Sequence, residues 1–166
     1  TTSPPAAEEN DSPDDDQEVN SQVMHWYRKA AELGDAFYQY EFGQLQAGGF
    51  GVPQDWAEAA DWFRKSAEQG NADAQFNLGT CYWNGQGVAQ DRIEAVRWLR
   101  KAADQGDQSG QFGLGVAYST GDGVSQDHAE AALLFRRAAE QGHATAQFNL
   151  SVLYGKGKDV HRNSKG

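Results

Sequence analysis

The segment Ala72–Gly106 reads ADAQFNLGTCYWNGQGVAQDRIEAVRWLRKAADQG, and its pattern recurs every 36 residues through most of the chain. Several sets of residues are in phase, among them Gly34, Gly70, Gly106 and Gly142, and also Gln39, Gln75, Gln111 and Gln147. A fixed period between about 20 and 50 residues is typical of a solenoid, in which each unit stacks on its neighbours. A residue that recurs in every copy is therefore interpreted first as a packing residue.

Each copy contains two predicted helices joined by a glycine-rich turn. In the first helix, Ala74, Leu78 and Tyr82 are spaced by four residues and share one helical face. In the second helix, the apolar residues of 91–105 fall at spacings of three and four. The two glycines of the turn break the helix and allow positive φ angles. The pattern predicts one antiparallel helix pair for each copy.

Matching signals mark where each second helix begins and ends. An Asp at the N-cap accepts from helical N–H groups, and a Glu three residues later can reach back to the N–H of the cap. Basic residues in the last turn and a following Gly suit the helix dipole and a left-handed cap. The three predicted capping boxes are Asp55 with Glu58, Asp91 with Glu94, and Asp127 with Glu130.

Glycine also recurs inside the first helix of three copies, at Gly43, Gly79 and Gly115, and the fourth copy has Ser151 there. Glycine within a helix costs about 1 kcal/mol relative to alanine, so its repeated use predicts a close neighbouring backbone. A large apolar side chain is expected in the core of each second helix. The residues at this position are Trp26, Trp62, Trp98 and Leu134.

These residues resemble the Sel-one-like repeat, a relative of the tetratricopeptide repeat. The shared pattern is Ala-x-x-x-Leu-Gly-x-x-Tyr-x-x-Gly-x-Gly-Val-x-x-Asp-x-x-x-Ala-x-x-Trp-x-x-Lys-Ala-Ala-x-x-Gly. Residues 74–106 match it throughout, and residues 110–142 and 38–70 match it with a few substitutions. The resemblance implies an all-α, right-handed superhelical solenoid of antiparallel helix pairs. It also implies a protein-binding scaffold or adaptor.

The sequence predicts one repeat array with a tail at each end. Residues 21–160 form the array, as a half repeat, three full repeats and a half repeat. Residues 1–20 contain seven acids and no Lys or Arg, and we expect a disordered acidic tail or linker. The net charge of −10 is therefore concentrated there, because the remaining residues have 17 acids and 14 bases. Residues 161–166 are expected to be disordered.

The chain has no initiator Met and no apolar leader segment, so we expect a mature product or an excised fragment. The array can then continue in the parent protein. The sequence leaves the compartment open, with a bacterial envelope or periplasmic location and a cytoplasmic one both compatible with it.

Few residues carry separate chemistry. Cys81 is the only cysteine, and the interpretation we favour for it is a packed small residue. The four histidines fall at unrelated phases, and the Gly-x-Gly turns lack the strand that a phosphate-binding loop requires. We expect no catalytic residue, no metal site and no cofactor. Net acidity argues against nucleic-acid binding, and no apolar run is long enough for membrane insertion.

The candidate site is the concave face, which the first helices line in tetratricopeptide solenoids. The aromatic row on this face recurs in every copy, which favours packing between repeats as its role, and its members are Tyr40, Phe76, Phe112 and Phe148. Positions beside the row vary between copies, as a binding surface requires. Trp83 is the strongest candidate because it is large and aromatic at a position where the other copies have Ala47, Ser119 and Gly155. The predicted partner-binding residues are Tyr40, Gln44, Phe76, Thr80, Trp83, Phe112, Val116 and Phe148.

We therefore predict a non-enzymatic scaffold or adaptor that binds a protein or peptide on its concave face. A structural spacer or assembly module within a larger protein is the first alternative. An enzyme or binding protein for cell-wall-related or β-lactam ligands is a second, although no Ser-x-x-Lys motif is present. We also expect weak self-association through the C-terminal half repeat, because a solenoid end normally needs a polar outer face.

Overall fold

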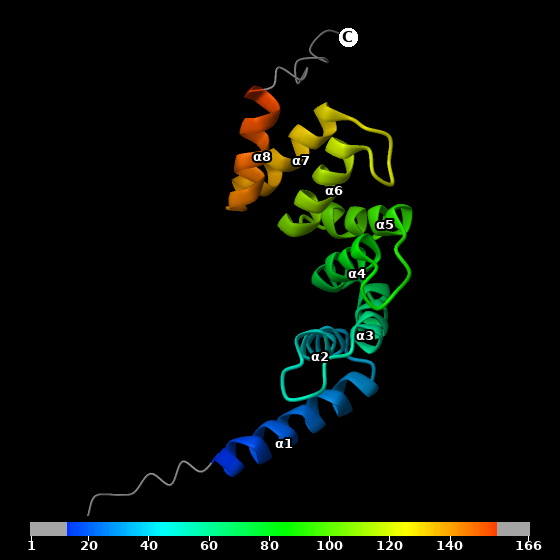
Figure 1. Ribbon diagram of the computed structural model, residues 1–166, viewed down its shortest axis with the longest axis vertical. Coiled ribbons are helices and arrows are strands. Elements are labelled where there is room, and N and C mark those ends of the chain that lie inside the picture. Colours follow the sequence, from blue (N-terminus) through cyan, green and yellow to red (C-terminus); the bar gives the residue numbers. More distant parts are fainter. Residues whose placement is uncertain (1–12, 156–166) are drawn as a thin grey trace, which may run out of the picture.

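The structure, a computed structural model, describes residues 13–155 as a stack of α-helices with no strand in that range. Figure 1 shows the stack as an arc, with α2, α4 and α8 toward its hollow side and α3 and α5 toward its outer side. The all-α solenoid of helix pairs is confirmed. The helices are α1 (Pro13–Glu32), α2 (Ala36–Gly48), α3 (Trp56–Glu68), α4 (Ala72–Asn84), α5 (Arg92–Asp104), α6 (Gln108–Thr120), α7 (His128–Glu140) and α8 (Ala144–Gly155).

Helix α1 begins at Pro13, so residues 13–20 of the expected tail are helical instead. A proline fits the first turn of a helix because its missing N–H has no partner there in any case and its fixed φ suits the helix. The rest of the expected tail, residues 1–12, and the expected end, 161–166, lie outside the described residues.

The predicted N-caps of the second helices are confirmed. The backbone of Asp55 is extended, and its carboxylate accepts from the N–H groups two and three residues later at 2.9 Å. Asp91 and Asp127 repeat this arrangement. The predicted bond back from Glu58 is wrong, because the N–H of Asp55 donates to the carbonyl of Gln46 at 3.0 Å. Since Gln46 lies in the first helix of the same pair, this bond also ties the two helices together.

Pairs of glutamines, one exposed at the end of a second helix and one buried in a first helix, join each repeat to the one before it. The Nε2 group of Gln69 donates to the carbonyl of Gly34 at 2.9 Å and to Oε1 of Gln39 at 2.8 Å. Gln39 in turn donates to a carbonyl of the preceding second helix at 3.2 Å. Gln105 and Gln141 make the same two bonds one and two repeats later. These bonds, here called the glutamine ladder, satisfy amides that would otherwise be buried without partners.

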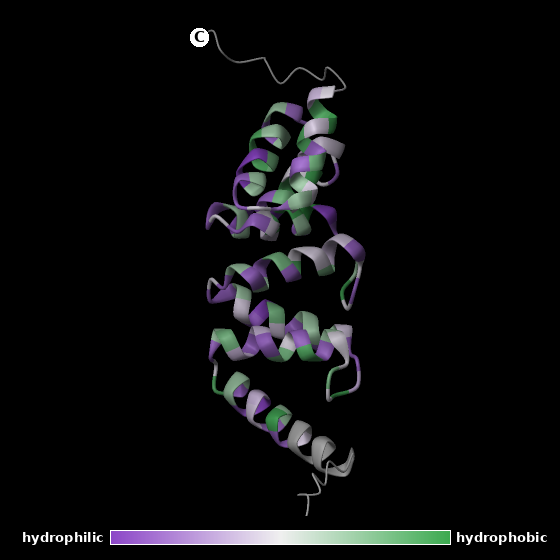
Figure 2. Ribbon diagram, turned by 90° about the vertical axis from the view of Figure 1, so that its left-hand side faces the viewer, coloured by the Kyte–Doolittle hydropathy of each residue, from purple (hydrophilic) through white to green (hydrophobic). Residues whose placement is uncertain are grey.

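The expected apolar plug of the second helix is present in three copies. Trp62, Trp98 and Leu134 are buried. The prediction is wrong for Trp26, whose side chain is 68% exposed. The reason is its place in the stack: α1 packs against α2, and no first helix precedes it among residues 13–155 to cover its other side. Figure 2 shows hydrophilic and hydrophobic residues mixed along the coloured parts of the helices, as partly covered helices require.

The glycines inside the first helices touch the second helix of their own pair. A Cβ atom at Gly115 would lie 2.8 Å from a ring carbon of Phe135, and Gly43 has the same relation to Phe63. A Cβ atom at Gly79 would lie 3.0 Å from Cγ of the flexible Leu99 side chain and 3.2 Å from the backbone carbonyl oxygen of Ala95. The predicted close backbone is therefore found at Gly43 and Gly79, whereas side chains supply the nearest contacts at Gly115.

Replacing Gly115 with alanine is expected to lower the free energy of unfolding by about 1–2 kcal/mol. Overpacking against the buried Phe135 ring costs about 1–3 kcal/mol, and the gain in helix propensity returns at most about 1 kcal/mol. Gly79→Ala should cost less, because Leu99 can move aside. Urea denaturation followed by far-UV circular dichroism measures both. A Gly115→Ala protein as stable as the parent would show that this contact is not tight.

Helix α8 closes the described part of the array and packs against α7. Leu153 is buried, Leu150 and Val152 are half-buried, and Phe148 is 66% exposed. The apolar surface at this end is consistent with the expected self-association, which stays a prediction.

Candidate functional site

Two small pockets open between neighbouring first helices. The first pocket, of about 90 Å³, lies between α2 and α4 with Phe63 of α3 in its wall. Its polar rim comes from side-chain amides and a hydroxyl, whereas Ala47 and the ring of Phe63 make it apolar inside. The residues around it are Gln44, Ala47, Trp56, Phe63, Asn77, Thr80, Cys81 and Gln86.

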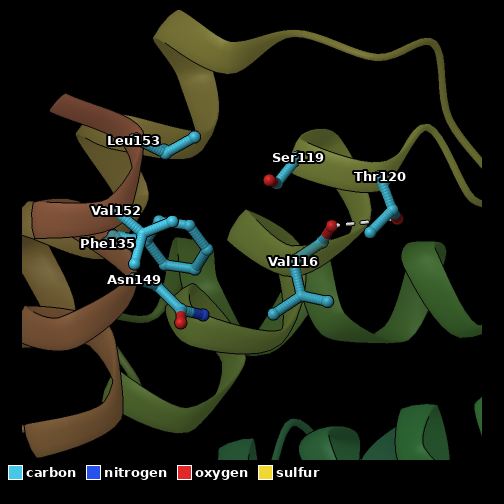
Figure 3. Close-up of a pocket in the computed structure, with 7 residues that line it drawn as sticks. All are labelled: Val116, Ser119, Thr120, Phe135, Asn149, Val152 and Leu153. Atoms are coloured by element: carbon cyan, nitrogen blue, oxygen red, sulfur yellow. Dashed lines mark hydrogen bonds between the residues drawn. The ribbon is translucent and has the colours of Figure 1, made fainter. Parts of the chain in front are cut away.

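The second pocket, of about 170 Å³, lies between α6 and α8. Figure 3 shows Val116 and Ser119 on one side, Asn149 and Val152 on the other, and the ring of Phe135 from α7 between them. Thr120 completes the rim, and its hydroxyl is already used within the helix, donating to a carbonyl one turn back at 3.1 Å. A cavity of about 150 Å³ holds a benzene molecule, so this pocket is large enough for one apolar side chain.

The two pockets are the same site two repeats apart. Six lining positions of the second pocket lie 72 residues after lining positions of the first, as the pairs Gln44 and Val116, Ala47 and Ser119, Phe63 and Phe135, Asn77 and Asn149, Thr80 and Val152, and Cys81 and Leu153 show. The repeat between them has Trp83 at the position of Ala47 and Ser119. Trp83 is half-buried and packs against the cluster that contains Leu99 and Leu114. From its position we infer that the Trp83 side chain takes up the space that the smaller Ala47 and Ser119 leave open.

The structure separates the predicted site residues into three groups. Gln44 and Thr80 line the first pocket, and Val116 lines the second. Four aromatic side chains are half-buried against the core, namely Tyr40, Phe76, Trp83 and Phe112. Phe148 is exposed on α8 and lines neither pocket.

Phe112 is the member of the aromatic row with the most aromatic contacts. Its ring stacks on His143 with centroids 4.4 Å apart and lies 5.8 Å from the ring of Phe135. His143 caps α8, because its Nδ1 atom accepts from the N–H of Ala146 at 3.2 Å. Phe112 therefore packs against the core beside the cap of α8, whereas Phe148, at the equivalent position of α8, is exposed.

The sequence analysis missed the pocket residues Asn77, Gln86, Asn149 and Phe135. A signal for the pockets was present in the variation at one position, where Ala47 and Ser119 are small. We interpreted this variation as favouring the large residue, Trp83, although the small residues are the ones that leave space.

The remaining chemistry of the described region is sparse. Burial raises the pKa of the Cys81 thiol to about 11, so the thiol stays protonated near neutral pH. This supports the interpretation of Cys81 as a packed residue. Within residues 13–155 no group of three or more His, Cys, Asp and Glu side chains could hold a metal ion. No helix in the same range has the length and apolar character needed to cross a bilayer.

The stacked helix pairs and the glutamine ladder define an α-helical solenoid of 36-residue repeats. The Sel1 repeat model matches residues 24–35, 36–71, 72–107, 108–143 and 144–165. The chain belongs to the Sel1 repeat family, as its resemblance implied. Sel1 repeat solenoids generally serve as protein-interaction scaffolds. No curated protein sequence matches the chain.

Solved structures show the same fold. The chain is 44% identical to c5321, a protective antigen of uropathogenic Escherichia coli strains, with a TM-score of 0.83 over 87% of this chain and 31% of that one. It is 33% identical to a Sel1 repeat protein from Oxalobacter formigenes, with a TM-score of 0.78, covering 87% and 59% of the two chains. Cysteine-rich protein B of Helicobacter pylori is 25% identical, with a TM-score of 0.62, covering 81% and 96%. The chain thus spans about a third of the first of these proteins and well over half of the second.

Proposed function

We propose that this chain is a non-enzymatic peptide-binding scaffold, whose partner places one side chain in each of the two pockets. The observation that carries the proposal is the shared register of the pockets. Two equivalent openings, built by the same repeat positions on either side of the repeat that contains Trp83, suit a ligand that runs along the stack.

The geometry favours a peptide in an extended conformation. Packed helices lie about 8–10 Å apart, so pockets two repeats apart are separated by roughly 20 Å. An extended chain advances ~3.3 Å per residue, which places the two anchoring side chains about six residues apart. The frame between the pockets is held by hydrogen bonds and buried rings, so little ordering is needed on binding.

Filling either pocket with tryptophan is expected to weaken peptide binding at least tenfold. Ala47→Trp and Ser119→Trp each copy what Trp83 does in the middle repeat, so the fold has a precedent for the larger residue. The probe is a random library of displayed peptides of about 12 residues, long enough in extended form to span both pockets. Fluorescence anisotropy then measures the affinity of each selected peptide for the parent and for both variants.

Ala129→Trp is the matched control. Ala129 is exposed on α7, and the equivalent residue one repeat earlier, Ile93, is large and 67% exposed. Its binding should equal that of the parent, and thermal melting should show all the variants folded. The proposal fails if no peptide is enriched over a surface without protein, or if the selected peptides bind both pocket variants as tightly as the parent.

A further inference from the structure

The two ends of the described stack carry the two halves of one kind of interface. Each internal unit pairs a first helix with the second helix that follows it, as α2 pairs with α3, α4 with α5 and α6 with α7. Among residues 13–155, α1 is a second helix with no first helix before it, and α8 is a first helix with no second helix after it. Figure 1 shows α1 and α8 at opposite ends of the arc, so one molecule does not bring them together.

One contact of the internal pairs is incomplete at both ends. Within the α2–α3 pair, the ring of Phe42 lies edge-on to Trp62, with centroids 5.6 Å apart. The equivalent residues at the ends of the stack are Leu150 on α8 and Trp26 on α1. Leu150 is only half-buried and Trp26 is 68% exposed. Each end therefore has one member of an apolar pair and lacks the other.

A second contact is incomplete at the same two ends. The ring of Phe112 on α6 packs 5.8 Å from the ring of Phe135 on α7, and the α2–α3 pair repeats this contact at 6.2 Å. The equivalent residues at the ends are Phe148 on α8 and Tyr27 on α1. Phe148 is 66% exposed and Tyr27 is half-buried. The exposed face of α8 thus matches, position by position, the face that α1 leaves uncovered.

The sequence before α1 lacks the first-helix pattern. The repeat period places a first helix for α1 within residues 1–12, but these residues contain two consecutive prolines and no Ala-x-x-x-Leu-Gly sequence. The Sel1 repeat model accordingly matches from residue 24 onward. Helix α8 has the pattern with one change, as Ala146, Leu150 and Ser151. A second copy of the chain can therefore provide what the sequence before α1 does not.

The charges of the two ends are opposite. Residues 1–20 contain seven acids and no Lys or Arg, whereas residues 156–166 contain four basic residues and one acid. In an internal pair the second helix starts beside the end of the first, since the N–H of Asp91 donates to the carbonyl of Tyr82 at 3.0 Å. The same geometry between two copies places the end of α8, which the basic sequence follows, beside the acidic start of α1. Charge complementarity of this kind selects partners and accelerates their encounter.

We propose that α8 of one copy docks on α1 of a second copy and completes a repeat between the two molecules. In this pair Phe148 packs on Tyr27 and Leu150 covers Trp26. The interface is head-to-tail, so a pair of copies keeps one free face of each kind and the association is open-ended. Ser151 replaces the glycine that touches the second helix in the internal pairs, which makes this junction looser and the association weak. The inference does not depend on the proposed function.

The test measures self-association by sedimentation equilibrium on the chain of residues 1–166. The mean mass of the parent should rise with concentration beyond that of a dimer, and higher salt should lower it. Trp26→Gln removes the α1 face and Phe148→Gln the α8 face, and each should weaken self-association at least tenfold. Both side chains are largely exposed, so circular dichroism should show both variants folded. An equal mixture of the two should form dimers and nothing larger, because each variant keeps one intact face.

Ile93→Gln is the matched control, because this side chain is 67% exposed on α5, away from both ends. It should associate as the parent does. The inference fails if the parent stays monomeric up to about 1 mM, or if Ile93→Gln weakens association as much as the two end variants. It also fails if either end variant alone associates like the parent, or if mixing the two produces no dimer.

Discussion

Replacing Trp62 with alanine is expected to lower the free energy of unfolding by about 3–5 kcal/mol, as truncation of a buried aromatic residue does. The indole is 8% exposed and lies edge-on to Phe42, with ring centroids 5.6 Å apart. The ammonium group of Lys65 lies 3.9 Å from the ring centre, so a cation–π contact is lost as well. Urea denaturation followed by circular dichroism measures the change without relying on tryptophan fluorescence.

Trp26→Ala is a control at the same position of the repeat. Because its side chain is largely exposed, its removal should change stability by no more than about 0.5 kcal/mol. If both variants lose about 3–5 kcal/mol of unfolding free energy, α1 is covered in solution by something that packs on Trp26. If both lose no more than about 0.5 kcal/mol, Trp62 is not a core residue.

Gly87→Ala is expected to cost about 2–5 kcal/mol through two separate effects. Gly87 has a φ of +71°, a conformation that costs an L-residue about 1–2 kcal/mol. A Cβ atom there would also lie 1.9 Å from the backbone carbonyl oxygen of Trp56, in the preceding repeat. Backbone cannot rotate away as a side chain can, and forced overpacking adds about 1–3 kcal/mol. Thermal and urea denaturation of the variant measure the combined loss.

Gly106→Ala separates the two effects. Its φ is +86°, but a Cβ atom at this position would have no neighbour within 4 Å. We expect this variant to lose only the conformational part, about 1–2 kcal/mol. If Gly87→Ala is no worse than Gly106→Ala, the loop between α4 and α5 does not press on the preceding repeat in solution.

The repeat and its helix boundaries could be predicted from the sequence because they depend on local chemistry. The caps at Asp55, Asp91 and Asp127 are signals that act within one turn of helix. The hydrogen-bond partner of the Asp55 N–H was not predictable, because its acceptor is the carbonyl of Gln46 in another helix. The exposure of Trp26 was equally out of reach, because periodicity shows which face of a helix is apolar and not whether a neighbour covers it.

The candidate site was predicted less well, for a related reason. The sequence indicated the first helices, which line both pockets, and the variable position that distinguishes Ala47, Trp83 and Ser119. Whether a large residue there projects as an anchor or fills a gap depends on the distance between two neighbouring helices. That distance is set by tertiary packing, so the pockets emerged only from the structure.

The glutamine ladder also limits how such a chain can grow. Each amide reaches back to acceptors 35 and 30 residues earlier, in every rung from Gln69 to Gln141. A gain or loss of one residue within a unit would break both bonds of a rung, whereas duplication of a whole unit preserves them. Length therefore changes in whole modules, and each added module brings one further position equivalent to Ala47 or Trp83. A single codon there then decides whether the lengthened groove gains an open pocket or a closed one.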